Sequence, residues 1–129
     1  MKKHNVKNLN LNTQGGMTFL GLVIVGALVL CIVFAGIKVA PAYIEFFSVK
    51  KIIQRIGSNG SLDSMSKKDI EVEFDKNANT SYVAVIKGRD LLITKDADGR
   101  QVVTAEYQVV KPLALNLSAL MDFKASTAK

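Results

Sequence analysis

The sequence predicts an α+β fold: an N-terminal membrane-spanning helix, an amphipathic extension of that helix, one further short helix and a small antiparallel sheet of three or four strands. Three observations carry this prediction. Residues 17–37 contain no charged side chain, apolar residues recur at helical spacing over 44–56, and from residue 82 they alternate with polar residues. These changes of pattern divide the chain into a leader at 1–15, a span at 16–38, an amphipathic helix at 39–57 and a head at 62–129.

The uncharged run is long enough to cross a membrane. At about 1.5 Å per helical residue it spans roughly 31 Å, which is the thickness of the hydrocarbon layer of a bilayer. A cleaved secretory signal has a shorter apolar stretch of roughly 7–15 residues followed by small residues, whereas this run ends at Lys38. We therefore expect a retained anchor, preceded by a polar, Asn- and Lys-rich cytoplasmic leader.

An amphipathic helix is expected directly after the span. Pro41 either kinks the helix or starts a new one, and Tyr43 suits the headgroup level of a membrane. The apolar face of this helix comprises Ile44 or Phe46, Val49, Ile52, Ile53 and Ile56. Gly57 should end the helix, and residues 57–61 read as a flexible connection.

The head begins with a second helix near Ser66, because Ser66 and Asp69 stand at the spacing of a capping box. Ile70 and Phe74 would share one face of it. Strands are expected at 82–86, 90–95, 101–110 and 120–126. Asp96 to Gly99 reads as a hairpin turn, in preference to a calcium loop, because the other oxygen ligands and a closing glutamate are missing. Pro112 should interrupt the sheet and leave an irregular apolar crossing over 113–119.

Composition excludes several classes of function. The net charge is +6, but after the span fourteen Lys and Arg are interspersed with eleven Asp and Glu, which does not form the basic stripe of a nucleic-acid-binding protein. The single cysteine, Cys31, lies inside the apolar run, and the single histidine, His4, lies in the polar leader. We expect no catalytic, cofactor-binding or metal-binding residues and therefore a non-enzymatic protein, although spacing alone does not exclude a Ser/Lys pair brought together in space.

Two sets of residues suggest contacts with other proteins. Ala27, Cys31 and Ala35 form a stripe of small residues at four-residue intervals, which would let a second membrane helix, or another copy of this one, approach closely. The second set lies just outside the membrane and consists of Ile44, Phe46, Phe47 and Val49. Because Phe46 and Phe47 are adjacent, one should pack inward while the other remains available.

The N-terminal segment resembles the leader and first helix of type IV prepilins. The resemblance rests on Lys2-Lys3, on the run from Gly15-Gly16-Met17 to Leu20, and on an apolar helix that continues into an amphipathic one. It implies that a membrane peptidase cuts after Gly16 and methylates Met17. Prepilins carry a glutamate at the fifth position after the cut, where this chain has Gly21, so the carboxylate that drives subunit assembly in that family is missing.

Over almost its full length the chain is similar to small single-span proteobacterial inner-membrane proteins of unknown function, often encoded beside signal peptidase I. The shared features include residues 39–43, 48–51, Pro112-Leu113 and Asp122-Phe123. This resemblance implies a membrane partner such as signal peptidase I or a secretion component. The Lys and Arg residues on the two sides of the span do not decide its orientation, but the short polar leader and the prepilin resemblance favour a cytoplasmic N-terminus and a periplasmic head. The expected function is an accessory role in protein export, signal-peptide processing or envelope assembly; the alternative is a minor pilin-like subunit cleaved after Gly16.

Overall fold

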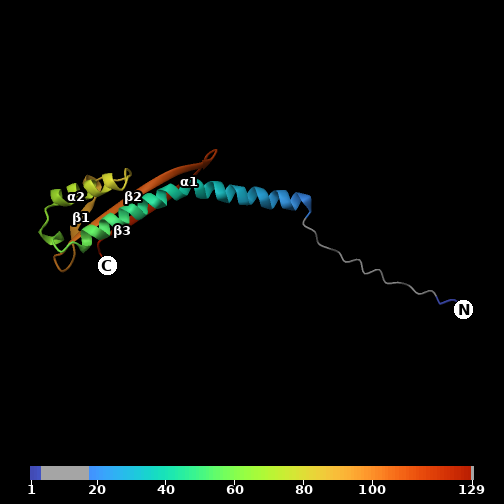
Figure 1. Cartoon of the computed structure of the whole chain (residues 1–129), viewed down its shortest axis with the longest axis horizontal. Coiled ribbons are helices and arrows are strands. Elements are labelled where there is room, and N and C mark those ends of the chain that lie inside the picture. The colour runs from blue at the N-terminus through green and yellow to red at the C-terminus, as the bar shows by residue number, and fades with distance from the viewer. Residues whose placement is uncertain (4–17, 129) are drawn as a thin grey trace. The chain divides into compact units, whose positions relative to one another are not determined.

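The computed structural model describes residues 1–3 and 18–128 and has the predicted α+β fold. The leader prediction for residues 4–15 and the processing site at Gly16 and Met17 lie outside the described residues. The elements in chain order are α1 (Phe19–Ser58), the short 3₁₀ turn η1 (Leu62–Ser64), α2 (Lys67–Thr80), a second 3₁₀ turn η2 (Gly88–Asp90), β1 (Leu92–Lys95), β2 (Gln101–Ala114) and β3 (Leu117–Ser126) (Figure 1). The chain divides into two compact units, Met1–Ile32 and Val33–Lys129, which are described separately.

The first unit contains the beginning of α1. The Thr18 hydroxyl accepts a hydrogen bond from the N–H of Gly21 at 3.3 Å, and it thereby caps the helix. The large apolar side chains that follow are exposed. By length and composition α1 can cross a membrane, and none of its most apolar window is buried. This helix is compatible with a membrane anchor.

α1 continues through Pro41 to Ser58 as one helix, so Pro41 does not start a new helix. A proline inside a helix removes one backbone hydrogen bond and opposes helix formation by about 3 kcal/mol. Packing of the second half of α1 compensates for this loss, because Val49, Ile52, Ile53 and Ile56 are each 3% exposed or less. The predicted apolar face is therefore confirmed from Val49 onward, and the helix ends one residue after Gly57.

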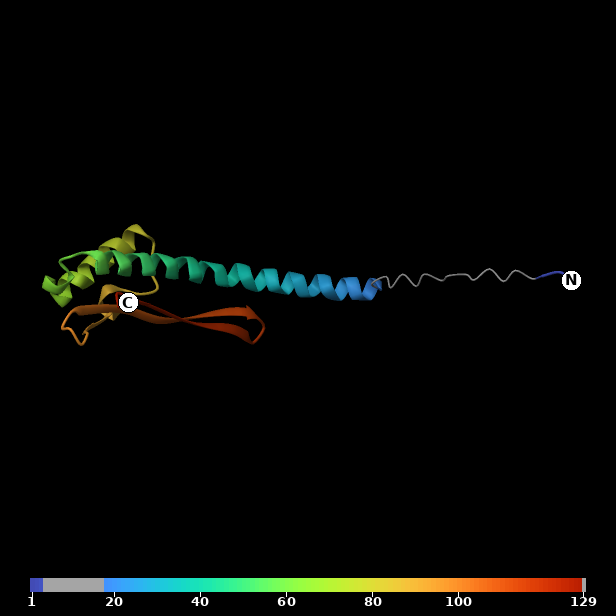
Figure 2. The same ribbon diagram turned by 90° about the horizontal axis from the view of Figure 1, so that it is seen from below.

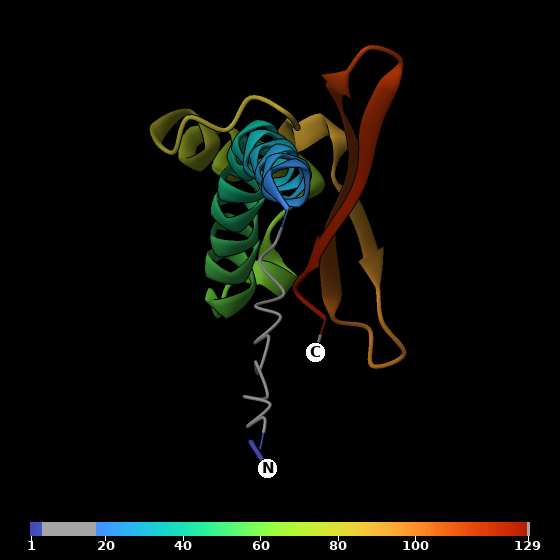
Figure 3. The ribbon, with the colours of Figure 1, turned by 90° about the vertical axis from the view of Figure 1, so that its right-hand side faces the viewer.

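The second unit has a core between its helices and one face of the sheet (Figures 2 and 3). α1 contributes the residues just named, α2 contributes Ile70, Phe74 and Ala78, and the strands contribute Val103, Ala105 and Ala125. The capping box that starts α2 is confirmed: the Ser66 hydroxyl accepts from the Asp69 N–H at 3.2 Å, and the Asp69 carboxylate accepts from the Ser66 N–H at 3.0 Å. Hydrogen bonds from the Ser66 side chain and backbone lower the pKa of Asp69.

The sheet is antiparallel, in the order β1-β2-β3. The predicted turn between β1 and β2 is confirmed. Gly99 has a φ of 77°, and the Asp96 carboxylate accepts hydrogen bonds from the N–H groups of Asp98 and Arg100, both at 2.9 Å. Asp96 thus shapes the turn through its own backbone.

The predicted strand at 82–86 is wrong. The backbone of this segment bonds elsewhere: the Val83 N–H donates to the Ala78 carbonyl at 2.9 Å, and the N–H groups of Ala84 and Val85 donate to the Glu45 carboxylate at 2.8 and 2.9 Å. Three consecutive donors of this segment are thus bonded to α1 and α2, which prevents the regular ladder of a strand. The sheet therefore has three strands.

The predicted break at Pro112 is also wrong, because β2 and β3 form one long hairpin that includes it. Pro112 stands opposite Ser118, and a register irregularity follows before Ala114 pairs with Leu117. β1 pairs only with residues 101–104, so the other edge of β2 is open at Pro112. A proline is tolerated at a strand edge or a bulge because its missing N–H is not needed there.

Candidate functional site

The surface that best fits a functional role lies on α1 immediately after the uncharged run. Ile37, Ala40, Ile44 and Phe47 follow one another at intervals of three or four residues, so they lie along one side of the helix. All four are exposed, with Ile44 at 66% and Phe47 at 54%. We call these four residues the α1 stripe. The α1 stripe therefore extends the exposed apolar surface of α1 past Lys38.

Beside the α1 stripe, four aromatic side chains pack together. We call Tyr43, Phe46, Tyr107 and Phe123 the aromatic cluster. The Phe46 ring stacks on Phe123 with centroids 4.8 Å apart and an interplanar angle of 21°. Tyr43 meets the same ring edge-on at 5.1 Å, and Tyr107 lies 5.5 Å from it. These contacts join this part of α1 to β2 and β3, and they fix the direction in which the α1 stripe faces.

The four predicted membrane-proximal residues therefore separate into two groups. Ile44 and Phe47 are exposed, whereas Phe46 is half-buried on Phe123, as expected for two adjacent phenylalanines. The placement of Val49 at an interaction surface is wrong, because Val49 is fully buried in the core. Its side chain lies on the same face as Ile52, Ile53 and Ile56, which is the face toward the sheet.

Glu45 is a residue that the sequence analysis missed. It lies beside Ile44, and its carboxylate holds the backbone of Ala84 and Val85 against α1. The signal that could have revealed it is its position, since it is the only acidic residue between the uncharged run and Gly57. A lone carboxylate on an apolar helix calls for a partner, and here two backbone N–H groups supply one.

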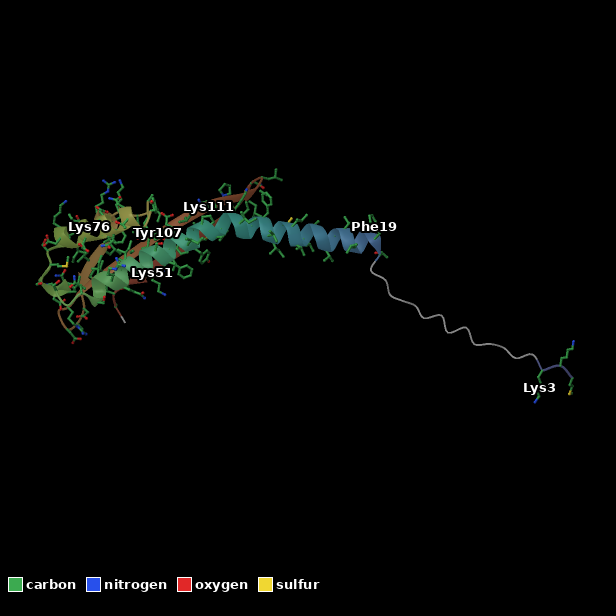
Figure 4. The ribbon with its side chains drawn as sticks, in the orientation of Figure 1. Lys3, Phe19, Lys51, Lys76, Tyr107 and Lys111 are labelled. Carbon is green, nitrogen blue, oxygen red and sulfur yellow. The ribbon has the colours of Figure 1, made fainter. Side chains whose placement is uncertain are left out.

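Tyr107, labelled in Figure 4, is the member of the aromatic cluster whose pKa is shifted. Its hydroxyl is buried and has no hydrogen-bond partner within the described part of the chain. Burial, and to a smaller extent the negative charge of Glu45, raise the pKa of Tyr107 from 10.0 to about 12. Tyr107 therefore stays protonated at neutral pH.

Replacing Tyr107 with phenylalanine should stabilise the head. The substitution removes a buried hydroxyl that lacks a partner and keeps the ring that contacts Phe123, so we expect the free energy of unfolding to rise by about 1 kcal/mol at pH 7. Pulse proteolysis of the full chain in detergent measures this quantity. A loss of stability would mean that the hydroxyl has a partner after all.

The same variant should change the dependence of stability on pH. Above pH 10 the unfolded chain releases the Tyr107 proton, whereas the folded chain retains it until about pH 12. The folded state then binds more protons, so the free energy of unfolding falls as the pH rises from 10 to 12. Tyr107→Phe should lack this part of the decrease in the free energy of unfolding. Because lysine titration is the same in both proteins, the difference between their free energies of unfolding reports Tyr107 alone. Parallel slopes would contradict the assignment.

A concave surface in the described residues lies at the far end of α1. It is a cleft of about 510 Å³ whose lining includes Gly57, Asp63, Arg100 and Gln101. Its polar groups are engaged with one another: Asp63 accepts from the Gln101 N–H at 2.8 Å, and Arg100 pairs with Asp96 at 3.4 Å. Among residues 1–3 and 18–128, no three His, Cys, Asp or Glu side chains gather in a way that could hold a metal ion.

The remaining predicted site residues, Ala27, Cys31 and Ala35, precede the α1 stripe in the chain. Ala27 and Cys31 belong to the first unit, where Cys31 is exposed. Ala35 belongs to the second unit and is partly exposed. Their proposed role in helix docking stays a prediction.

Comparison with known proteins identifies a family domain that comprises α1 from Lys38 onward and most of the head. The family described as "Domain of unknown function (DUF4845)" matches residues 38–123, which is well over half of the chain. No curated protein and no solved structure matches the chain. The match begins at Lys38 and includes most of the α1 stripe, the aromatic cluster, α2 and the sheet. The chain therefore belongs to the DUF4845 family.

Proposed function

We propose that this chain is a non-enzymatic, bitopic inner-membrane protein that binds another membrane protein through the α1 stripe. The observation that carries the proposal is the exposure of Ile44 and Phe47 directly after the uncharged run, on a helix that the aromatic cluster holds in place. Exposed apolar side chains on a rigid element are suited to contact a partner. The leader would lie in the cytoplasm and the head in the periplasm.

The resemblance to proteins encoded beside signal peptidase I suggests the partner class. We propose signal peptidase I or a secretion component, so that the chain would act as an accessory factor in export, signal-peptide processing or envelope assembly. The small residues Ala27, Cys31 and Ala35 would support close packing of α1 against a partner helix or a second copy of the chain.

Co-purification in mild detergent tests the proposal. A chain carrying both Ile44→Ser and Phe47→Ser should recover at least tenfold less of the membrane protein that co-elutes with the wild type, because each buried apolar side chain contributes about 1.5–3 kcal/mol to a contact. The matched control carries Val72→Ser and Leu92→Ser, two apolar residues with similar exposures of 55% and 54% outside the α1 stripe. Equal recovery with both variants would contradict the role of the α1 stripe. Mass spectrometry identifies the co-eluting protein, and the absence of signal peptidase I would reject that partner alone.

The pilin-like alternative is favoured by one observation, namely the continuity of α1 from its apolar half through Pro41 into the half that packs on the sheet. This layout agrees with the prepilin resemblance of the sequence. Mass spectrometry of the mature N-terminus separates the two proposals: methylated Met17 would support a processed subunit, and intact Met1 would exclude it. Because Gly21 lacks the carboxylate that drives assembly in prepilins, the chain would be at most a minor component of a filament.

A further inference from the structure

The end of the β2–β3 hairpin is apolar, and it is exposed because the rest of the head does not cover it. Between Lys111 and Asp122 the chain has ten residues without a charged side chain. We call residues 110–120 the hairpin tip. Its exposed large apolar side chains are Val110, Leu115, Leu117 and Leu120.

The sheet face that points away from the helices changes character along the hairpin. Far from the tip, Glu106 stands opposite Lys124 with their charged groups 3.8 Å apart, and the next outward pair is Gln108 with Asp122. Toward the tip the outward pairs become Val110 with Leu120, and then Pro112 with Ser118. A sheet face in water is expected to remain polar along its whole length. Along the β2–β3 hairpin, the outward pairs thus become apolar toward the tip.

Contacts within the second unit place the hairpin tip level with the start of the α1 stripe. The Lys38 ammonium donates a hydrogen bond to the Leu113 carbonyl at 2.8 Å, and it lies 5.8 Å from the centre of the Phe34 ring. Lys38 is the first charged residue after the uncharged run, the position at which a lysine typically reaches the headgroups. Lys111, labelled in Figure 4, lies on β2 at the start of the hairpin tip and adds a second positive charge for anionic headgroups.

The turn itself contains a residue that is unusual for its backbone conformation. Leu115 has a φ of 49°, which in two-residue hairpin turns is typical of glycine, asparagine or aspartate. A fully exposed leucine in this conformation gains nothing from the head in exchange for the backbone strain. An apolar surrounding outside the chain would compensate for it.

We infer that the hairpin tip inserts into the interfacial layer of the membrane leaflet next to the head. The inference rests on the membrane anchoring in the proposed function and is independent of any protein partner. Within residues 18–128, nothing pairs with either outer edge of the hairpin near the tip, and unpaired backbone groups do not enter the hydrocarbon centre. Insertion is therefore shallow, about 5–10 Å deep. The head then contacts the bilayer at two places, through α1 and through the tip.

Fluorescence quenching of the full chain in vesicles of phosphatidylethanolamine and phosphatidylglycerol tests this inference. In a Cys31→Ala background, a polarity-sensitive dye is attached through Ser118→Cys, which leaves every leucine of the tip in place. Asn59→Cys, exposed beyond the far end of α1, is the control outside the membrane, and Leu20→Cys, near the N-terminal end of the uncharged run, reports on the span. Lipids with a nitroxide near the headgroup should quench the Ser118 dye several-fold more strongly than the Asn59 dye. Adding Leu115→Asp and Leu117→Asp should reduce the Ser118 quenching to the level of the control.

The outcomes are distinct. Quenching at Ser118 no stronger than at Asn59, with the span dye still quenched, overturns the inference and leaves the anchor intact. An unquenched span dye rejects both the anchor and the inference. A blue shift at Ser118 without quenching shows that protein covers the tip, and quenching that survives the two aspartates shows that tethering alone brings it near the lipid; either result overturns the inference.

Discussion

Gly88→Ala should destabilise the head by about 3 kcal/mol and lower its melting temperature by more than 10 °C, roughly the shift expected for a domain of this size. A Cβ atom at residue 88 would overlap the Glu71 carbonyl oxygen and lie 2.7 Å from its carbonyl carbon. The obstacle is backbone of α2 and cannot rotate away. Moving residue 88 outward would also break the bond that the Gly88 N–H donates to the Asp75 carboxylate at 2.6 Å.

Gly60→Ala is the matched control, because a Cβ atom at residue 60 meets nothing within 4 Å. We expect the stability of this control to lie within about 0.5 kcal/mol of the wild type. Circular dichroism of the full chain in detergent follows both melts. If Gly88→Ala melted together with the control, the close approach of η2 to α2 would be incorrect.

The parts of the fold that depend on local patterns were predictable from the sequence. The uncharged run, the Ser66–Asp69 capping box and the turn at Gly99 each involve residues close together in the chain, and the structure has the corresponding helix, cap and turn. The apolar spacing over 49–56 likewise identified the side of α1 that packs on the sheet.

The errors arose where a distant side chain decides the local structure. Residues 82–86 have the alternation of a strand, but a carboxylate about forty residues earlier binds their backbone. Pro112 normally ends a strand, yet it is tolerated here because β1 is too short to reach it. The helical spacing had already placed Val49, and not Phe47, on the face that packs on the sheet, so counting Val49 among the interaction residues went against that pattern. The sequence thus predicted where the candidate site lies on the chain, but not which of its side chains are exposed.

Glu45→Ala should lower the free energy of unfolding by about 2 kcal/mol, because it removes an ionised acceptor shared by two backbone donors in a largely exposed setting. Glu45→Gln keeps an acceptor oxygen without the charge, so about half of that loss is expected. Glu106→Gln is the control, since the partner of Glu106 is the exposed Lys124 and such surface pairs contribute about 0–1 kcal/mol. Pulse proteolysis at pH 7 ranks the three variants.

The two Glu45 variants should also lower the pKa of Tyr107 from about 12, because the charge that helps to raise it is removed, while burial, the larger cause, remains. Tyrosinate absorbance, measured as the difference between each protein and its Tyr107→Phe counterpart, reports this change apart from the other two tyrosines. A stability loss in Glu45→Ala with an unchanged Tyr107 pKa would separate the two roles of the carboxylate. Glu45 would then hold residues 84 and 85 against α1 without setting the electrostatics beside the aromatic cluster.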